Sequence, residues 1–247
     1  MVLRALVFDF DGLIADTEWP EYRSVAEQFE VHGLAFPPEE WIHVIGSSWN
    51  VDWLGDLERR LGRAVDRDEL TEQRRARLQV LLADLIVLPG VVGLLERAHA
   101  AGLRLAVASS SPRSWVEPHL ERFDLRRWFD AVRTGDDVAR TKPAPDLFLE
   151  ACAALGVDPG DAVALEDSAN GARAARAAGL RCVVVPNRLT ALSDLSHADL
   201  RLETLLDLAL EDLGALCEAG AMIEAEATRS ADEPVGTAPE GGDTIAP

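Results

Sequence analysis

A short apolar run at the start of the chain, Leu3–Phe8, leads directly into Asp9 and Asp11, and Gly12 follows them. An apolar run of this length that ends in a glycine turn predicts a buried strand. In an open α/β sheet, ligands bind at the edge formed by the carboxyl ends of the strands. Side chains alternate along a strand, so Asp9 and Asp11 can point the same way. Two like charges held so close favour a divalent cation with oxygen ligands, although two exposed turn aspartates are the simpler alternative.

Further apolar runs alternate with helical patterns in the second part of the chain. The predicted strands after the first are Leu103–Ala108, Ala131–Thr134, Ala162–Leu165 and Cys182–Val185. The predicted helices between and after them are Val91–Ala101, Trp115–Phe123, Asp146–Leu155 and Gly171–Ala178, three of which stop at a glycine. This alternation predicts an α/β fold with a doubly wound, parallel, Rossmann-like sheet.

The segment from Thr17 to about Ile86 is helical and amphipathic, and it is longer than any crossover between two strands requires. We therefore expect an inserted α-helical cap domain. The expected division is a core of residues 1–16 and 88–213, a cap of residues 17–87, and a disordered acidic tail of residues 214–247.

Composition narrows the functional class. The chain has 247 residues, of which 48% are hydrophobic and 27% charged, as in ordinary globular proteins. A net charge of −19 argues against nucleic acid as a partner, and no apolar stretch is long enough to span a membrane. Three cysteines without metal-ligand spacing are typical of a reducing cytoplasm. We expect a cytoplasmic protein that is a monomer or a weak dimer.

Three more polar segments follow predicted strands: Ser109-Ser110-Ser111, Thr141-Lys142-Pro143 and Glu166-Asp167-Ser168. Lys142 is the only lysine among the 24 lysine and arginine residues. This bias indicates a site that needs a compact ammonium rather than a planar guanidinium. The alternative is that a lysine stands at this position by chance. The serines can form an anion cradle or simply cap a helix. The acidic pair can extend the cation site or lie solvated before a helix.

Together these groups suit a phosphate monoester, whose negative charge repels an anionic nucleophile. Mg²⁺ and Lys142 would neutralise that charge, and Ser109 with nearby amides would hold the phosphate oxygens. A carboxylate can then attack phosphorus and form an aspartyl-phosphate. A second carboxylate would protonate the leaving alcohol and afterwards deprotonate water.

These motifs, in this order, resemble the haloacid dehalogenase superfamily over essentially the whole chain except the tail. The resemblance implies Asp9 as nucleophile and Asp11 as general acid/base. It also implies phosphate binding by Ser109, Ser110 and Lys142. For the Mg²⁺ ion it implies a site made by Asp9, the Asp11 carbonyl and Asp167, with Glu166 nearby.

The insertion resembles the helical cap of the β-phosphoglucomutase-like branch, which implies a cap that opens and closes and selects the substrate. Asp11 disfavours the dehalogenases, and a cap without lysine disfavours phosphonate cleavage. Glu18, Glu21 and Trp49 are the candidate substrate residues of the cap. Glu21 and Trp49 stand where the mutase has a histidine and an arginine, which favours a phosphatase of small phosphorylated metabolites over a sugar phosphomutase. A non-catalytic binding protein on the same scaffold is the third hypothesis.

Overall fold

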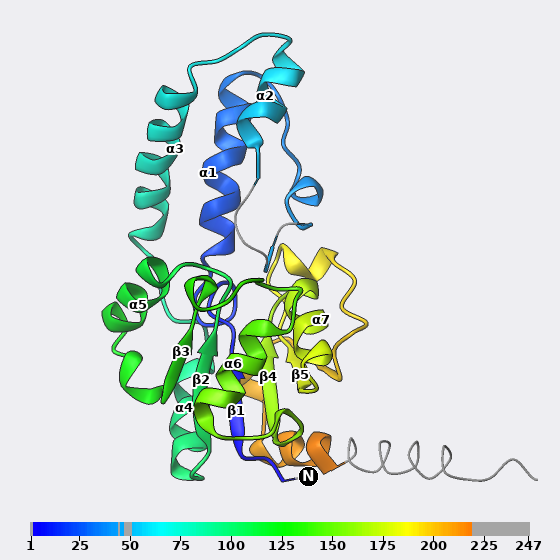
Figure 1. Ribbon diagram of the computed structural model, residues 1–247. Coiled ribbons are helices and arrows are strands. Elements are labelled where there is room, and N and C mark those ends of the chain that lie inside the picture. The colour runs from blue at the N-terminus through cyan, green and yellow to red at the C-terminus, as the bar shows by residue number, and fades with distance from the viewer. Residues whose placement is uncertain (1, 44, 47–50, 219–247) are drawn as a thin grey trace, which may run out of the picture.

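The computed structural model describes residues 2–43, 45–46 and 51–218, and its centre is a sheet of parallel strands (Figure 1). The strand order is β3-β2-β1-β4-β5-β6, with every pair parallel. The strands are β1 (Ala5–Phe8), β2 (Arg104–Ala108), β3 (Ala131–Arg133), β4 (Ala162–Glu166), β5 (Arg181–Val184) and β6 (Leu200–Arg201). The predicted doubly wound α/β sheet is therefore confirmed.

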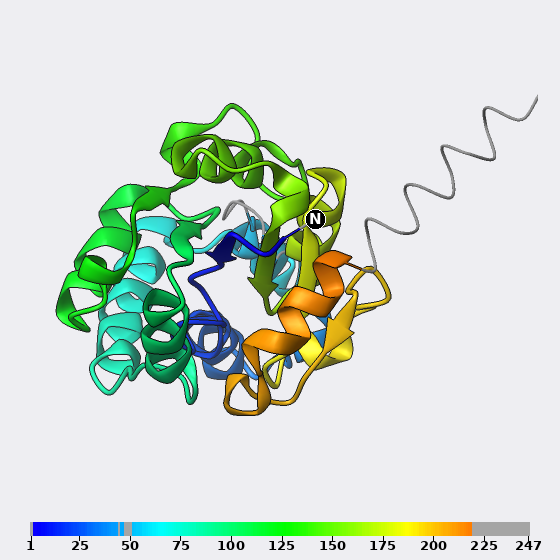
Figure 2. The same cartoon turned by 90° about the horizontal axis from the view of Figure 1, so that it is seen from below.

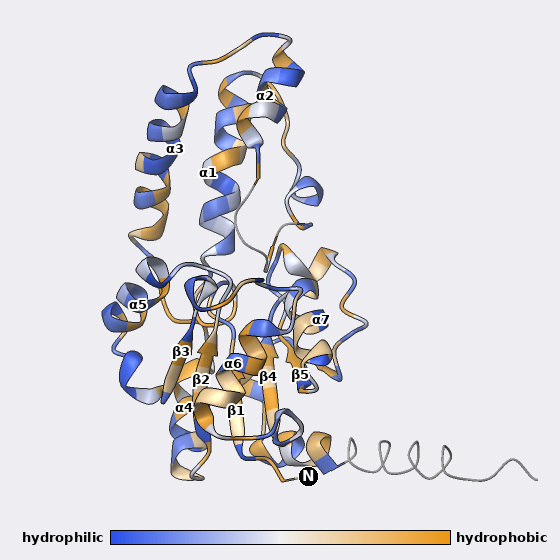
Figure 3. Cartoon of the chain, viewed as in Figure 1, coloured by the Kyte–Doolittle hydropathy of each residue, from blue (hydrophilic) through white to orange (hydrophobic). Residues whose placement is uncertain are grey.

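Both faces of the sheet are buried, and the first strand shows why. Leu6 and Phe8 belong to one hydrophobic cluster and Ala5 and Val7 to another, on opposite faces, and all four side chains are fully buried. Because side chains alternate along a strand, an uninterrupted apolar run contributes to both layers at once. The strands are accordingly the most continuously apolar segments in Figure 3.

Helices cover the two faces of the sheet, as the view along the strands shows (Figure 2). One face carries α4 (Val91–Ala100) and α5 (Arg113–Arg122), and the other carries α6 (Asp146–Leu155) and α7 (Ala169–Ala177). Short 3-10 turns occur at Arg126–Trp128, Gly135–Asp137, Pro159–Asp161, Thr190–Leu192 and Leu205–Asp207.

A helical part, which we call the cap, lies beyond the carboxyl edge of the sheet (Figure 1). It contains α1 (Glu18–Val31), a 3-10 turn (Pro38–Glu40), α2 (Trp53–Leu61) and α3 (Arg67–Leu82). Its own hydrophobic cluster includes the buried Phe29, Trp41 and Trp53. Ala15 forms an isolated antiparallel bridge with Val87, so the two connections between core and cap run side by side there. The boundaries at residues 17 and 87 stay our proposal.

The end of the chain departs from the sequence-based expectation. Residues 210–218 are helical, and Leu213 and Cys217 are fully buried in the cluster that also contains β1. Residues 214–218 are thus part of the core rather than of a tail, because two apolar side chains four positions apart bury one helix face. Residues 219–247 lie outside the described part. The two-residue strand β6, too short for a periodic pattern, was not predicted.

No helix within the described ranges is both long and apolar enough to cross a bilayer.

Candidate active site

The predicted site residues meet at the point where the strand order reverses. β1 lies between β2 and β4, which is the topological switch point where α/β sheets bind ligands. Asp9 follows the last residue of β1, and its backbone N–H donates to the carbonyl of Leu165 at 2.9 Å. Gly12 has a φ of 84°, and a Cβ there would lie 2.3 Å from Oδ2 of Asp167. Only glycine lets the first loop turn so closely past the carboxylate after β4.

Lys142 lies at the centre of the site, almost fully buried. Its ammonium group donates to Asp9, and to Oε1 of Glu166 at 2.5 Å. Burial alone would lower the pKa of Lys142, but the carboxylates of Asp9 and Glu166 outweigh burial and raise it. Burial also raises the pKa of Asp9 to about 8, although the Lys142 charge acts in the opposite direction. The sole lysine therefore joins the first and fourth motifs.

Asp9, Glu166 and Asp167 fit a divalent cation. One carboxylate oxygen from each lies within 4.8 Å of the other two. Oδ2 of Asp167 accepts from the Asn187 amide at 2.8 Å, whereas its Oδ1 is buried without a hydrogen-bond partner in the described part of the chain. Burial and then the Asp9 charge raise the pKa of Asp167 well above its usual range. Clustered carboxylate oxygens with a buried acceptor that lacks a partner suit a hard divalent cation.

Asp11 lies beside this cluster and is held by side chains from three segments. Its Oδ1 accepts from the Thr17 hydroxyl at 2.7 Å and from the Trp115 indole N–H at 2.8 Å. Its Oδ2 accepts from Ser111 at 2.6 Å and from Ser109 at 3.3 Å. Four donors therefore fix the second aspartate of the first motif.

The three serines after β2 have different partners. The Ser109 hydroxyl is fully buried and faces Asp11, and it also accepts from the Ser111 backbone N–H at 3.1 Å. The Ser110 hydroxyl instead donates to the carbonyl of Gly46, in the cap, at 3.0 Å. In this arrangement Ser110 joins core to cap, so its expected phosphate-binding role stays untested. Ser111, the last serine of this segment, makes the shorter of the two serine hydrogen bonds to Asp11.

Glu166 is held on the side away from Lys142 by the start of α7. Its Oε2 accepts from the backbone N–H groups of Asp167 and Ser168, at 3.2 and 3.4 Å, and from the Ser168 hydroxyl at 3.1 Å. Ser168 also caps α7 by accepting from the Gly171 N–H at 3.0 Å. A Cβ at Gly171 would lie 1.9 Å from the Glu166 carboxyl carbon, so a larger residue would displace that carboxylate.

The cap contributes two buried carboxylates, Glu18 and Glu21, from the first turn of α1. Burial and then the charge of Asp11 raise the pKa of Glu18 well above its usual range. Burial raises the pKa of Glu21 to about 7, although its ion pair with Arg74 on α3 counteracts the rise. The charge of Asp11 acts on both glutamates, and their expected role in substrate selection stays a prediction. Trp49 is outside the described residues.

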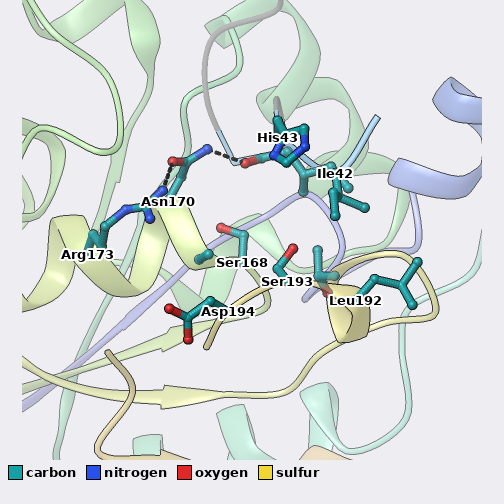
Figure 4. A pocket seen from close by; sticks show the side chains of 11 residues that line it. Ile42, His43, Ser168, Asn170, Arg173, Leu192, Ser193 and Asp194 are labelled. Carbon is teal, nitrogen blue, oxygen red and sulfur yellow. Dashed lines mark hydrogen bonds between the residues drawn. The ribbon is translucent and has the colours of Figure 1, made fainter. Parts of the chain in front are cut away.

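Cap and core meet at a second place, beside α7. A cavity of about 260 Å³ lies there, between the cap segment around Ile42 and the core loop around Ser193 (Figure 4). Asn170 donates to the Ile45 carbonyl at 2.7 Å and accepts from Arg173 at 2.6 Å. The bonds of Asn170 to Ile45 and of Ser110 to Gly46 therefore join the core to the cap at this place.

A comparison with family models matches residues 3–179 to the haloacid dehalogenase-like hydrolases and residues 139–223 to a second model of this group. The chain belongs to this family. The resemblance drawn from its four motifs is confirmed.

Among curated proteins, the hydrolase is similar to "Putative phosphatase YhcW" of Bacillus subtilis, with 41% identity over 85% of this chain and 95% of that one. It is also similar to hexitol phosphatase B of Escherichia coli (strain K12), with 35% identity over 85% and 96% of the two chains.

Solved structures show the same architecture. CbbY from Rhodobacter sphaeroides, in complex with xylulose-(1,5)bisphosphate, has a TM-score of 0.70 at 32% identity and covers 86% of this hydrolase and 99% of its own chain. The β-phosphoglucomutase of Clostridium difficile has a TM-score of 0.69 at 21% identity, over 89% and 99% of the chains. The second likeness shows the fold alone.

Sequence reasoning did not find four residues of the hydrolase that hold buried carboxylates of the candidate site. Three of them donate to Asp11 or Asp167: Thr17, Trp115 and Asn187. The fourth is Arg74, which pairs with Glu21 across two cap helices. The position of Thr17 in the sequence could have indicated its role. It is the first residue of the expected cap and follows the motif around Asp11 closely, so its hydroxyl can reach back to that aspartate. For Trp115, Asn187 and Arg74 the pairing is tertiary, and no short-range pattern encodes it.

Proposed function

We propose that this hydrolase is a Mg²⁺-dependent phosphatase of a small phosphorylated metabolite, a sugar phosphate or a nucleotide-like monoester, and that it acts through an aspartyl-phosphate on Asp9. The observation that carries the proposal is the buried cluster in which Lys142 binds Asp9 and Glu166 while Asp11 is held next to them. Strongly perturbed carboxylates around one ammonium in a buried site are typical of catalytic rather than structural groups.

The proposed reaction has two displacements. A carboxylate oxygen of Asp9 attacks phosphorus, the bond from phosphorus to the ester oxygen breaks, and Asp11 gives that oxygen its proton. Asp11 then takes a proton from water as the water oxygen attacks phosphorus. The bond to Asp9 breaks, inorganic phosphate leaves, and both aspartates return to their starting states. The ammonium of Lys142 and the hydroxyl of Ser109 stabilise the charge on the phosphoryl oxygens.

We propose Mg²⁺ as the cofactor, held by Asp9, Asp167 and the backbone carbonyl of Asp11, with Glu166 close by. When bound, it would supply charge neutralisation for the nucleophile and the phosphoryl group. Support comes from the three clustered carboxylates and from the unpartnered Oδ1 of Asp167 in the described structure.

The polar side chains of the cap support a substrate with hydroxyl groups. Glu18 and Glu21 are buried near Asp11, and Ser24 and Arg74 lie next to Glu21. Such groups can both donate to and accept from sugar hydroxyls. Relatives of this chain carry the names hexitol phosphatase B and CbbY, the latter solved with a sugar bisphosphate, which agrees with this class.

We also propose a cytoplasmic location and a monomer or weak dimer. The three cysteines, Cys152, Cys182 and Cys217, are buried free thiols, as expected in a reducing compartment. Sedimentation of the purified protein would test the oligomeric state.

The experiment is a phosphate-release screen over sugar phosphates, nucleotides and cofactor phosphates, with Mg²⁺ and with chelator. We expect Mg²⁺-dependent release from a subset of sugar-like esters. Isomerisation that is stimulated by a trace of bisphosphate, without phosphate release, would instead establish a mutase. No turnover of any ester by the folded protein would favour a binding protein.

A further inference from the structure

The chain after β5 passes the candidate cation site at residues 187–190, which we call the 187–190 turn. The side-chain amide of Asn187 donates to Oδ2 of Asp167 at 2.8 Å. The oxygen of the same amide accepts from the backbone N–H groups of Leu189 and Thr190, at 2.9 and 3.1 Å. Because only the NH₂ end of an asparagine amide donates, these bonds fix which end faces Asp167.

The Asn187 amide is enclosed as well as oriented. Its backbone N–H donates to the hydroxyl of the fully buried Thr190 at 2.9 Å. Gly12, in the loop after β1, packs so closely that a Cβ there would lie 2.7 Å from Nδ2 of Asn187. Oδ1 of Asp167 has no hydrogen-bond partner within the described residues. The carboxylate is thus held at one oxygen and available at the other, as expected of an oriented metal ligand.

The two residues that follow Asn187 attach the turn to the cap. Leu189 is 1% exposed and belongs to the hydrophobic cluster of the cap, together with Phe29. Arg188 donates to Oδ2 of Asp16 at 2.9 Å, and its guanidinium carbon lies 3.9 Å from the ring centre of Trp19 on α1. The amide that binds Asp167 is therefore carried by a segment of the core that packs into the cap.

We propose that Asn187 is a positioning residue for the divalent cation and that Leu189 makes this positioning depend on the cap. The amide orients the Asp167 carboxylate, and the packing of Leu189 holds the turn that carries the amide. The cap thus contributes to cation affinity, although the three clustered carboxylates of the described chain all belong to the core. This inference rests on the proposed Mg²⁺ site and adds two residues outside the four motifs.

The test is a calorimetric titration of the metal-free, full-length protein with MgCl₂, without substrate and at constant ionic strength. We expect Asn187→Ala to raise the Kd for Mg²⁺ about 10- to 100-fold, as the loss of a partner that orients a metal ligand does. We expect Leu189→Ala to raise it about 3- to 10-fold, because its effect is transmitted through the turn.

Two variants are matched controls, and both should bind Mg²⁺ as the wild type does. Leu57→Ala makes a cavity in the same cap cluster, since Leu57 is fully buried there, but Leu57 is not part of the turn. Asn170→Ala removes an amide that joins core to cap through Ile45, and the printed partners of this amide are Ile45 and Arg173 rather than Asp167.

Nuclear magnetic resonance of the side-chain amides gives a readout that a purely structural role would not move. The chain has three asparagines and three glutamines, so these signals are few, and the Asn187 signal is the one that disappears in Asn187→Ala. Addition of Mg²⁺ should shift this signal and leave that of Asn170 in place. Leu189→Ala should shift the Asn187 signal even before Mg²⁺ is added, whereas Leu57→Ala should not.

An unchanged Kd in Asn187→Ala would overturn the role of the amide, and equal losses in Leu189→Ala and Leu57→Ala would overturn the link to the cap. If Asn187→Ala does not fold, Asn187→Ser keeps a short acceptor for the turn but cannot reach Asp167, and the same loss of affinity is expected. A wild-type protein that binds no Mg²⁺ would refute the cation site and this inference together. Normal Mg²⁺ binding without hydrolysis of any ester would refute only the phosphatase.

Discussion

The core half and the cap half of this site hold their charges in different ways. In the core, Lys142 is bound directly to Asp9 and Glu166, and the side chains are nearly or fully buried. In the cap, Glu21 meets Arg74, whose side chain is 23% exposed, and Glu18 lies near the core acids rather than beside a base. In the core, the charged side chains share buried partners. In the cap, the polar groups are less enclosed, so a substrate can replace their present partners.

This difference suggests a division of roles, in which the core groups carry out the reaction and the cap groups select the substrate. Asp9 and Glu166 share the ammonium of Lys142, Asp11 accepts from three hydroxyls and an indole N–H, and Asp167 accepts from the Asn187 amide, so replacing one group disturbs its neighbours. Glu18 and Glu21 lie on α1 and Arg74 on α3, whereas the hydrogen bonds from Asn170 and Ser110 reach the cap at Ile45 and Gly46, outside these helices. We therefore expect core substitutions to abolish turnover of every ester and cap substitutions to act on particular substrates.

The strongest challenge to this comparison is Asp9→Asn. We expect loss of at least about 10³-fold in kcat with every ester, because an amide cannot form the acyl phosphate. Phosphate release measures it, and circular dichroism should show an intact fold. The exposed Asp212→Asn is the matched control. Activity of Asp9→Asn within a few-fold of wild type would remove the nucleophile assignment.

Lys142→Arg tests whether the core tolerates an equal charge of different shape. The pocket between Asp9 and Glu166 holds a buried ammonium, and the larger planar guanidinium does not fit it, so we expect about a 10²-fold loss of kcat. Arg140→Lys, two positions earlier and exposed, should have no effect. Equal values of kcat for Lys142→Arg and the wild type would show that a positive charge at position 142 is sufficient for turnover, whatever its shape.

A pH series sharpens the description of the cap. The pKa of Glu21 is raised from 4.5 to about 7, so the folded state keeps a proton that the unfolded state loses above pH 4.5. The free energy of unfolding of the wild type should therefore fall between pH 4.5 and 7, by at most about 3 kcal/mol from this group. In Glu21→Gln that part of the fall should vanish. Urea denaturation at pH 5 and pH 7.5 measures the fall in the free energy of unfolding for the wild type and for Glu21→Gln. An equal fall in the two proteins would show that Glu21 ionises normally.

The smallest effect concerns the end of the chain, away from both halves of the site. Truncation after Glu218 should leave kcat and the melting temperature unchanged. Truncation after Leu213 removes the fully buried Cys217 and should lower stability by about 1–3 kcal/mol while kcat stays the same. Calorimetry distinguishes the two truncated proteins by their stability. A large loss of kcat on truncation after Glu218 would show that residues beyond 218 act on the site.

The core was predictable because its signals are local. A strand such as β1 is an apolar run, and in parallel sheets the motifs after such runs must meet at one edge. Asp146–Leu155 was predicted with the bounds that the structure gives, since Gly156 ends the helical pattern. The cap segment was recognised by length, because no crossover needs so many residues.

What could not be predicted depends on contacts distant in sequence. Trp115 meets Asp11 only because α5 packs beside β1, and Ser110 turns to the cap because Gly46 comes near it. Cys217 joins the core because the last helix returns to the face of β1, although acidic neighbours there resemble a tail. These pairings are set by tertiary packing, which composition and periodicity do not encode.

The most direct test of the account is to trap the phosphoryl group on the enzyme. Asp11→Asn cannot activate water, and labelled p-nitrophenyl phosphate does not require a proton from Asp11 for its departure. After acid quenching and proteolysis, we expect the label on the peptide that contains Asp9, with none in Asp9→Asn. Rapid p-nitrophenol release by the wild type, with no label on that peptide in the trapping variant, would contradict covalent transfer to Asp9.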